Sequence, residues 1–324
     1  MQCKICDNAQ GNQTYRVREM MFGYRESFEY LECSQCGCLQ LVQIPADMSK
    51  YYAAAYYSFL PVDSESPNVL RRTAKRLRSA YALGDRGLVG SALFSVFPHH
   101  ELRSVAKAKL PRVPRILDVG CGRGKLLLEL KHAGFGELLG VDPFLECDIQ
   151  YPNGLLIRKC SLYEVTGQWD LVMFHHSFEH LADPLETLRY CSKLLSENGQ
   201  CLIRVPTVSS YAWRKYRENW VQLDAPRHYF LHSVRSLEML ASKAGLRMED
   251  VAYDSNEFQF WGSEQYCRDI PLHDERSYAR NPSKSIFARE DIRAFRKEAE
   301  ALNARKEGDQ AIFHLSKNRG EESR

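Results

Sequence analysis

The chain has 324 residues, of which 44% are hydrophobic and 26% charged, so it can bury one large domain and a smaller module. Its 44 basic and 41 acidic residues give a net charge of +3, a balance too even to argue for a polyanionic partner such as nucleic acid. No stretch approaches the roughly 18 apolar residues of a membrane span, and the polar N-terminus lacks the pattern of a signal peptide. The sequence therefore predicts a cytoplasmic protein and leaves its oligomeric state open.

Four of the eleven cysteines form two Cys-x-x-Cys pairs near the N-terminus. The pairs are Cys3 with Cys6 and, 26 residues later, Cys33 with Cys36. Each pair can place two thiolates on one side of a tight turn, and two such turns supply the four sulfurs of a closed, structural zinc site. Alternating residues between the pairs predict a hairpin that brings them together. We expect a zinc-binding module over residues 1–45, with buried, metal-free thiols as the alternative.

Residues 46–110 form a predicted helical connector. It begins with the aromatic stretch "MSKYYAAAYYSF", which either lines a pocket or packs between domains. Further on, "NVLRRTAKRLRSAYAL" places Leu70, Leu77 and Tyr81 on one face at helical spacing. Five basic residues occupy the other face, which is either solvated or able to contact phosphates.

The main domain is predicted over residues 111–255 and opens with "RILDVGCGRGKLL". Ile116 to Val119 read as a buried strand, and three glycines at alternate positions follow it before a helical stretch. Glycines at such a turn let the chain bend tightly and let a ligand approach bare backbone N–H groups. A second strand, "ELLGVD", ends in Asp142, whose carboxylate can accept hydrogen bonds from ribose hydroxyls. Together these features indicate an adenosine-containing cofactor.

The remaining elements predict an α/β fold with a doubly wound sheet. Further strands are expected at "GLLIR", "WDLVMFHH", "GQCLIRVP" and "RMEDVAYD", with helices between them. Residues 256–324 form a predicted C-terminal extension, in which a charged helix precedes a last strand, "DQAIFHLSK". We expect this strand to return to the sheet.

The motifs "ILDVGCGRG", "ELLGVD" and "HHSFEHLADP" resemble those of class I S-adenosylmethionine-dependent methyltransferases. The resemblance implies a Rossmann-like sheet of seven strands whose final strand runs antiparallel between the fifth and sixth. It implies that Asp118 and the glycine loop hold the methionine end of the cofactor and that Asp142 holds the ribose. Ser161 stands where many relatives have an acidic residue, so either its side chain or backbone alone holds the adenine. The implied cofactor contacts are Asp118, Gly120, Cys121, Gly122, Gly124, Asp142, Pro143, Ser161, Leu162 and His175.

Two other stretches narrow the expected acceptor. The N-terminal "CKIC" and "LECSQCGCLQL" are similar to the zinc-binding leader of bacterial methyltransferases that act on sugars, and "WVQLDAPRHYFLHS" looks like enzymes of polysaccharide pathways. This resemblance implies a small-molecule substrate, a sugar or sugar nucleotide, with O-methylation favoured over C-methylation. An RNA methyltransferase and a non-catalytic, cofactor-binding assembly factor are the alternative hypotheses.

Methyl transfer to oxygen needs a group that removes the proton of the acceptor, and histidine suits that step. His176 and His180 follow the fourth predicted strand, close to the expected cofactor. Asp224 and His228 follow the fifth, where the resembling family binds its acceptor. We predict that His228 is the general base and that Asp224 orients it or the acceptor, with His176 and His180 as the alternative bases.

Overall fold

The computed structural model describes residues 1–52, 69–84, 86–97, 100–108 and 110–318. Within these ranges, no helix is both long and apolar enough to cross a bilayer. The aromatic stretch after Tyr52 lies outside the described residues.

The strands are β1 (Gln13–Arg18), β2 (Ser27–Glu32), β3 (Leu39–Leu41), β4 (Arg115–Val119), β5 (Glu137–Val141), β6 (Ile149–Gln150), β7 (Leu156–Arg158), β8 (Trp169–His175), β9 (Leu195–Pro206), β10 (Phe230–Leu231), β11 (Leu246–Tyr253) and β12 (Gln310–Lys317). The helices are α1 (Val69–Ala82), α2 (Leu88–Val96), α3 (His100–Ala106), α4 (Lys125–His132), α5 (Pro184–Leu194), α6 (Tyr211–Tyr216), α7 (Val234–Lys243), α8 (Phe258–Cys267) and α9 (Arg289–Ala304).

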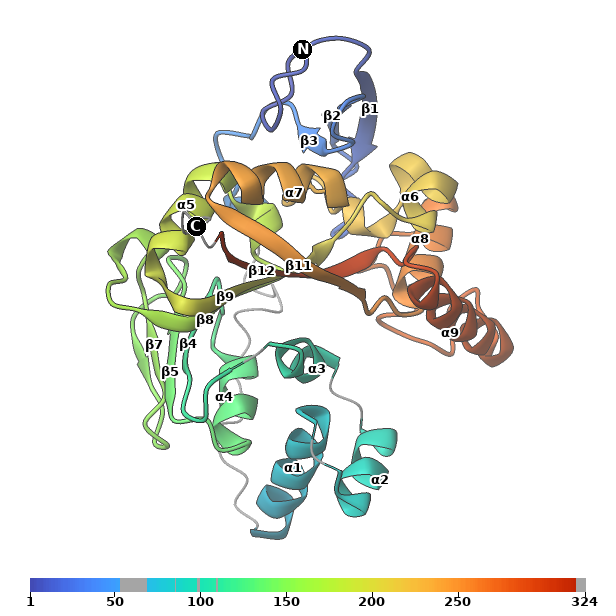
Figure 1. Ribbon diagram of the computed structural model, residues 1–324. Coiled ribbons are helices and arrows are strands. Elements are labelled where there is room, and N and C mark those ends of the chain that lie inside the picture. Colours follow the sequence, from blue (N-terminus) through green and yellow to red (C-terminus); the bar gives the residue numbers. More distant parts are fainter. Residues whose placement is uncertain (53–68, 85, 98–99, 109, 319–324) are drawn as a thin grey trace.

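The centre of the molecule is an eight-stranded sheet in the order β11-β12-β9-β8-β4-β5-β7-β6 (Figure 1). β7, β5, β4, β8 and β9 run parallel, whereas β12 lies antiparallel between β9 and β11. The expected α/β sheet with a returning antiparallel last strand is thus confirmed. All seven expected strands are present, and the two-residue strand β6 extends the sheet beyond β7.

Both faces of the sheet are covered at its centre, which explains why a central strand such as β8 is mostly apolar. In β8, Leu171 and Met173 pack into a core with the leucines of α4. Val172 and Phe174 belong to a second core with α5 and α7. Successive strand residues point to opposite faces, so a strand buried on both sides needs an unbroken apolar run. α5 begins where the sequence indicates, because the Asp183 carboxylate accepts the backbone N–H of Glu186.

The helical connector buries only part of the apolar face that the sequence indicates. Tyr81 of that face packs against Phe94 of α2, whereas Leu70 and Leu77 are 78% and 39% exposed. Ser79 of α1 is buried beside α4. Helical spacing groups these residues on one face but does not specify how much of that face a neighbouring helix covers.

The N-terminal segment forms a second, antiparallel sheet in the order β1-β2-β3-β10. Its fourth strand, β10, comes from the main domain, and Phe230 and Leu231 pair with Gln40 and Leu39. Residues 1–45, hereafter the N-terminal module, are therefore joined by a sheet to residues far along the chain. The domain boundaries expected at residues 45, 110 and 255 stay predictions, but this sheet crosses the first of them.

Candidate active site

The predicted cofactor residues gather at one edge of the large sheet. Asp118 lies near the end of β4, Asp142 directly follows β5, Ser161 follows β7, and His175 ends β8. These four strands are neighbours and run parallel, so their carboxyl ends meet at the same edge. Open α/β sheets bind ligands at this edge. We call it the cofactor edge.

The glycine loop at this edge has the backbone conformation that requires glycine. Gly120, Gly122 and Gly124 have φ angles of +71°, +53° and +75°, in the region that side-chain-bearing residues rarely adopt. A Cβ atom at Gly120 would also lie 2.5 Å from the Cβ of Ser177. The Ser177 hydroxyl donates to the Val119 carbonyl at 2.6 Å, which fixes this neighbour in place. The loop therefore cannot carry a side chain at Gly120 without moving the turn after β8.

The Asp142 carboxylate is nearly buried and already anchors two loops. One oxygen accepts the Gly122 N–H at 2.9 Å and the other accepts the Phe144 N–H at 2.9 Å. Burial raises the pKa of Asp142, and these two hydrogen bonds oppose the rise. Each carboxylate oxygen can accept a further hydrogen bond, so the group can still take a ribose hydroxyl.

Asp118 is buried with an unsatisfied oxygen. Its Oδ1 atom accepts no hydrogen bond from any described residue. Burial, together with the charges of Asp142 and Glu101, raises the pKa of Asp118 to about 8. A buried carboxylate of this kind is stabilised by a cationic partner. The position therefore fits an ammonium group of a ligand.

The other predicted cofactor residues contribute shape more than free polar groups. The Ser161 hydroxyl donates to Glu164 at 2.8 Å, which closes a short helical turn, so it is not a free donor for adenine. Leu162 is buried, Pro143 is exposed, and the Cys121 thiol contacts the Gly122 carbonyl. Their roles toward the cofactor stay predictions.

Next to the cofactor edge, three predicted histidines surround one buried glutamate. Glu179 is fully buried, and neither of its oxygens accepts a hydrogen bond from a described residue. His176 Nδ1 lies 3.4 Å and His228 Nε2 lies 3.9 Å from Glu179 Oε1. The His180 and His228 rings pack edge to face with centroids 4.8 Å apart. Burial alone would raise the pKa of Glu179, but the three histidines lower that pKa to about 2, so the group is a carboxylate.

Backbone carbonyls fix the orientation of two of these rings. His180 Nδ1 lies 2.8 Å from the Arg227 carbonyl, and His228 Nδ1 lies 2.8 Å from the Gln222 carbonyl. Since a carbonyl only accepts, each Nδ1 carries the proton and each Nε2 is left as an acceptor. Burial, reinforced by the nearby His180, lowers the pKa of His228 to about 4. His228 is therefore a neutral imidazole that can accept a proton at Nε2.

Asp224 lies beside His228 but does not fix the orientation of its ring. Asp224 Oδ2 is 3.8 Å from His228 Nε2, whereas Arg227 binds both Asp224 oxygens at 2.9 and 2.5 Å. Burial would raise the pKa of Asp224, but the Arg227 guanidinium lowers it to about 2. The predicted alternatives for Asp224 were to orient the base or the acceptor. The orienting partner of His228 is the Gln222 carbonyl.

Tyr52 connects the cofactor edge with the histidine cluster. Its ring stacks on Phe144, two residues after Asp142, with centroids 6.2 Å apart. Its hydroxyl lies 3.4 Å from His180 Nδ1. The start of the aromatic stretch therefore borders the site, which favours the pocket-lining interpretation for this residue.

Sequence reasoning missed two groups at this site. Glu179 is the carboxylate at the centre of the histidines. Arg227 is fully buried and ion-pairs with both Asp224 and Glu19. The spacing Asp-x-x-Arg-His could have suggested the Arg227–Asp224 pair. Nothing in the local sequence indicates Glu19.

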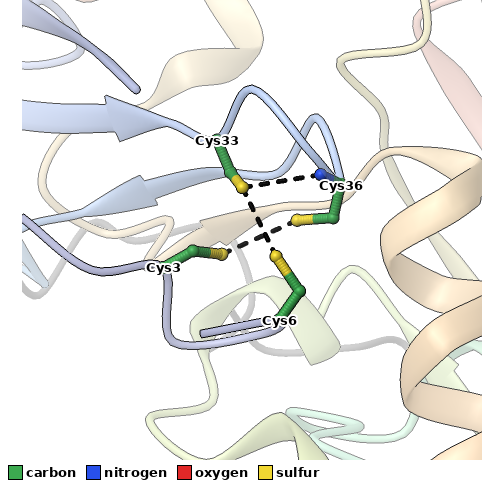
Figure 2. Close-up of side chains that lie close together, drawn as sticks. All are labelled: Cys3, Cys6, Cys33 and Cys36. Carbon is green, nitrogen blue, oxygen red and sulfur yellow. Dashed lines mark hydrogen bonds between the residues drawn. The ribbon is translucent and has the colours of Figure 1, made fainter. Parts of the chain in front are cut away.

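The two Cys-x-x-Cys pairs meet as the sequence predicts. Figure 2 shows the four side chains pointing toward one another, with Cys3 Sγ 3.6 Å from Cys36 Sγ and Cys6 Sγ 3.4 Å from Cys33 Sγ. Zinc–sulfur bonds of about 2.3 Å require tetrahedral sulfur separations of about 3.8 Å, so small adjustments admit the ion. The donor set and this spacing fit a closed structural zinc site.

Among the described residues, a second group has the composition of a metal site. The donor atoms of Glu179, His180 and His228 lie within 4.8 Å of one another. Chemically, this cluster can either exchange a proton at the free Nε2 atoms or hold a divalent ion there.

Residues 95–251 match a family profile described as "Methyltransferase domain". A ubiquinone biosynthesis O-methyltransferase of Xanthomonas axonopodis pv. citri (strain 306) is 26% identical over 177 residues, which cover 48% of this chain and 74% of that protein. Another, of Pseudomonas aeruginosa (strain LESB58), is 25% identical over 154 residues, which cover 42% of this chain and 66% of that protein. A SAM-dependent methyltransferase structure from Archaeoglobus fulgidus covers 78% of this chain and 100% of that chain at 22% identity, with a TM-score of 0.40.

The strand order, with its antiparallel last strand, and the glycine loop at the cofactor edge define a Rossmann-like domain of the class I type. With the matched profile, they identify an S-adenosylmethionine-dependent methyltransferase domain in this chain. The residues fit this cofactor: Asp118 offers an unsatisfied buried oxygen to its ammonium group, and Asp142 offers acceptors to its ribose. The acceptor of the methyl group is a separate question.

Proposed function

We propose that the protein transfers a methyl group to a hydroxyl oxygen of a small molecule, with His228 as the general base. The observation that carries the proposal is the free Nε2 atom of a buried, neutral His228, which lies between the carboxylates of Glu179 and Asp224. These carboxylates stabilise the imidazolium that forms when the ring takes a proton. The arrangement resembles a histidine base supported by an acid, and it lies beside the cofactor edge.

When bound, S-adenosylmethionine supplies an already activated methyl group, so the protein has to align the acceptor and remove its proton. The acceptor oxygen would lose its proton to His228 Nε2 as its bond to the methyl carbon forms and the sulfur–methyl bond of the cofactor breaks, with S-adenosylhomocysteine as the leaving group. Gln222 holds the ring in the required tautomer throughout. Arg227 keeps Asp224 ionised and in place.

One observation supports oxygen as the acceptor atom, and another suggests the chemical class of the substrate. The two relatives described above are O-methyltransferases by name. The acceptor side of the site presents imidazoles, a carboxylate and the Tyr52 hydroxyl, which suit a molecule with several hydroxyl groups. We propose a sugar or sugar nucleotide as the substrate class, in line with the resemblance of the N-terminal motifs.

The experiment is a methyl-transfer assay with isotopically labelled S-adenosylmethionine. The panel holds nucleoside-diphosphate sugars, free sugars, small phenols and total RNA, and mass spectrometry identifies the intact product. We expect one small hydroxyl compound to gain a methyl group, and fragmentation to place it on oxygen. Labelling of RNA alone, or of carbon in a sugar, would contradict the proposal.

A further inference from the structure

Residues from the N-terminal module hold the 222–233 segment, which carries His228, at several points, beside contacts from the main domain such as the Tyr229 N–H to the Glu179 carbonyl. The Tyr30 hydroxyl donates to the His228 carbonyl at 2.8 Å, and both residues are buried. The Leu41 N–H donates to the Tyr229 carbonyl at 2.8 Å, and β10 then pairs with β3. The His228 backbone is therefore fixed by residues almost 200 positions earlier in the chain.

Further contacts lie on both sides of His228. Directly before it, Arg227 donates to Glu19 at 3.2 Å while it holds Asp224. Glu19 is itself fixed, because its carboxylate accepts the backbone N–H groups of residues 22, 23 and 24. At the C-terminal end of the segment, the Ser233 hydroxyl donates to the carbonyl of Cys36, one of the four clustered cysteines.

Among the described residues, the hydrogen bonds at the cofactor edge come from the large sheet and its connections rather than from the module. The hydrogen bonds of Asp142 come from Gly122 and Phe144, and the hydroxyl against the glycine loop is that of Ser177. All of these residues belong to the large sheet and its connections. A substitution in the module should therefore disturb the position of the proposed base more than it disturbs cofactor binding.

We infer that the N-terminal module is a positioning element for proton removal, and that Tyr30 and Glu19 are its positioning residues. They act through the backbone of His228 and through Arg227, and neither has to touch the acceptor. The inference rests on the proposed function for its effect on catalysis. Its structural part, the fixing of residues 222–233 by the module, rests on the contacts alone.

The chain offers a matched pair of variants. Tyr15 and Tyr30 are cross-strand partners in β1 and β2. The Tyr15 hydroxyl donates to Glu32 within the module at 2.8 Å, whereas that of Tyr30 reaches His228. Tyr15→Phe and Tyr30→Phe therefore remove the same hydroxyl from the same small sheet, and only the second releases the 222–233 segment.

The test combines amide hydrogen exchange with kinetics on the full-length protein. We expect Tyr30→Phe to speed exchange in residues 222–233 by about tenfold and to lower kcat by about tenfold. Cofactor affinity, measured by calorimetry, should stay within about twofold, and Tyr15→Phe should match the parent protein in all three. Glu19→Gln removes a different contact to the same segment. This variant keeps the inference testable if Tyr30→Phe does not fold.

Equal exchange and turnover in Tyr30→Phe, Glu19→Gln and Tyr15→Phe would overturn the inference. A parallel loss of cofactor affinity in Tyr30→Phe and Glu19→Gln would also overturn it, because the module would then support the whole fold. His228→Asn separates this result from the proposed function. If His228→Asn keeps normal turnover while Tyr30→Phe frees the segment, the base assignment fails and the positioning of the segment stands.

Discussion

The cofactor edge and the 222–233 segment lie next to each other but are built in different ways. At the cofactor edge, Asp118, the glycine loop and Asp142 lie within one β-α-β unit, and Asp142 is held by Gly122 of that unit and by Phe144 directly after it. In the 222–233 segment, His228 depends on Tyr30, and Arg227 depends on Glu19. The first region can form wherever its motif occurs, whereas the second needs a separate module. A methyltransferase can thus keep one cofactor site and change its acceptor chemistry through a distant segment.

The largest expected effect is at the base. His228→Asn should lower kcat by at least about a hundredfold, because a positioned base contributes on the order of 10² to 10⁴ in rate. Cofactor affinity should stay nearly unchanged, which calorimetry checks. The matched control is His176→Asn, since His176 also faces Glu179 but has a φ of +52°, which asparagine tolerates. Normal turnover in His228→Asn, with a loss in His176→Asn or His180→Asn, would move the base to that histidine.

The second effect belongs to the cofactor edge alone. Asp142→Ala removes the proposed ribose acceptor and the anchor of two loops, and should weaken S-adenosylmethionine binding by about tenfold to a hundredfold. Asp148→Ala is the control, since its carboxylate caps an N–H in the same region without facing the glycine loop. Hydrogen exchange in residues 222–233 should not change in either variant. Equal S-adenosylmethionine affinity in the two variants would contradict a role for Asp142 in cofactor binding.

Metal loss at the four cysteines should affect the 222–233 segment more than the cofactor edge. Cys33→Ser is expected to lower the zinc content, speed exchange in residues 1–45 and in 222–233, and reduce kcat by about tenfold or more. Cofactor affinity should stay within about twofold. Cys267→Ser, an exposed cysteine outside the cluster, provides the control. Metal analysis of protein purified without added zinc is decisive, because less than about half an equivalent would favour free thiols.

The smallest expected effect is a pH dependence of cofactor affinity that comes from Asp118. In the free protein its pKa is about 8, so below that pH the group is mostly protonated. A bound ammonium favours the carboxylate, lowers its pKa and releases a proton, so cofactor affinity should rise with pH up to about 8, by at most tenfold per unit. Calorimetry in buffers of different ionisation enthalpy measures the proton release. Asp118→Asn should abolish it, and an unchanged pH dependence in that variant would exclude Asp118 as the source.

The predicted cofactor edge rests on local signals. A strand, a glycine turn and a second strand ending in an acid follow one another along the chain, and the geometry of parallel strands brings their ends together. The buried part of α1 could not be predicted in this way. Tyr81 packs against Phe94 of α2 while Leu70 and Leu77 stay exposed, because the position of the neighbouring helices decides which residues of one face are covered.

The sequence by itself determined the individual strands of the large sheet, the glycine turn after β4 and the two Cys-x-x-Cys pairs, because each follows from periodicity or spacing. The place of the last strand in that sheet was implied by the resemblance to the methyltransferase family. Only the tertiary structure decided that Glu179 lies between three histidines, and that Tyr30, Glu19 and β3 hold the segment of His228. These contacts join residues up to about two hundred positions apart. Their energy depends on burial and on exact distance, which a pattern of residue types does not specify.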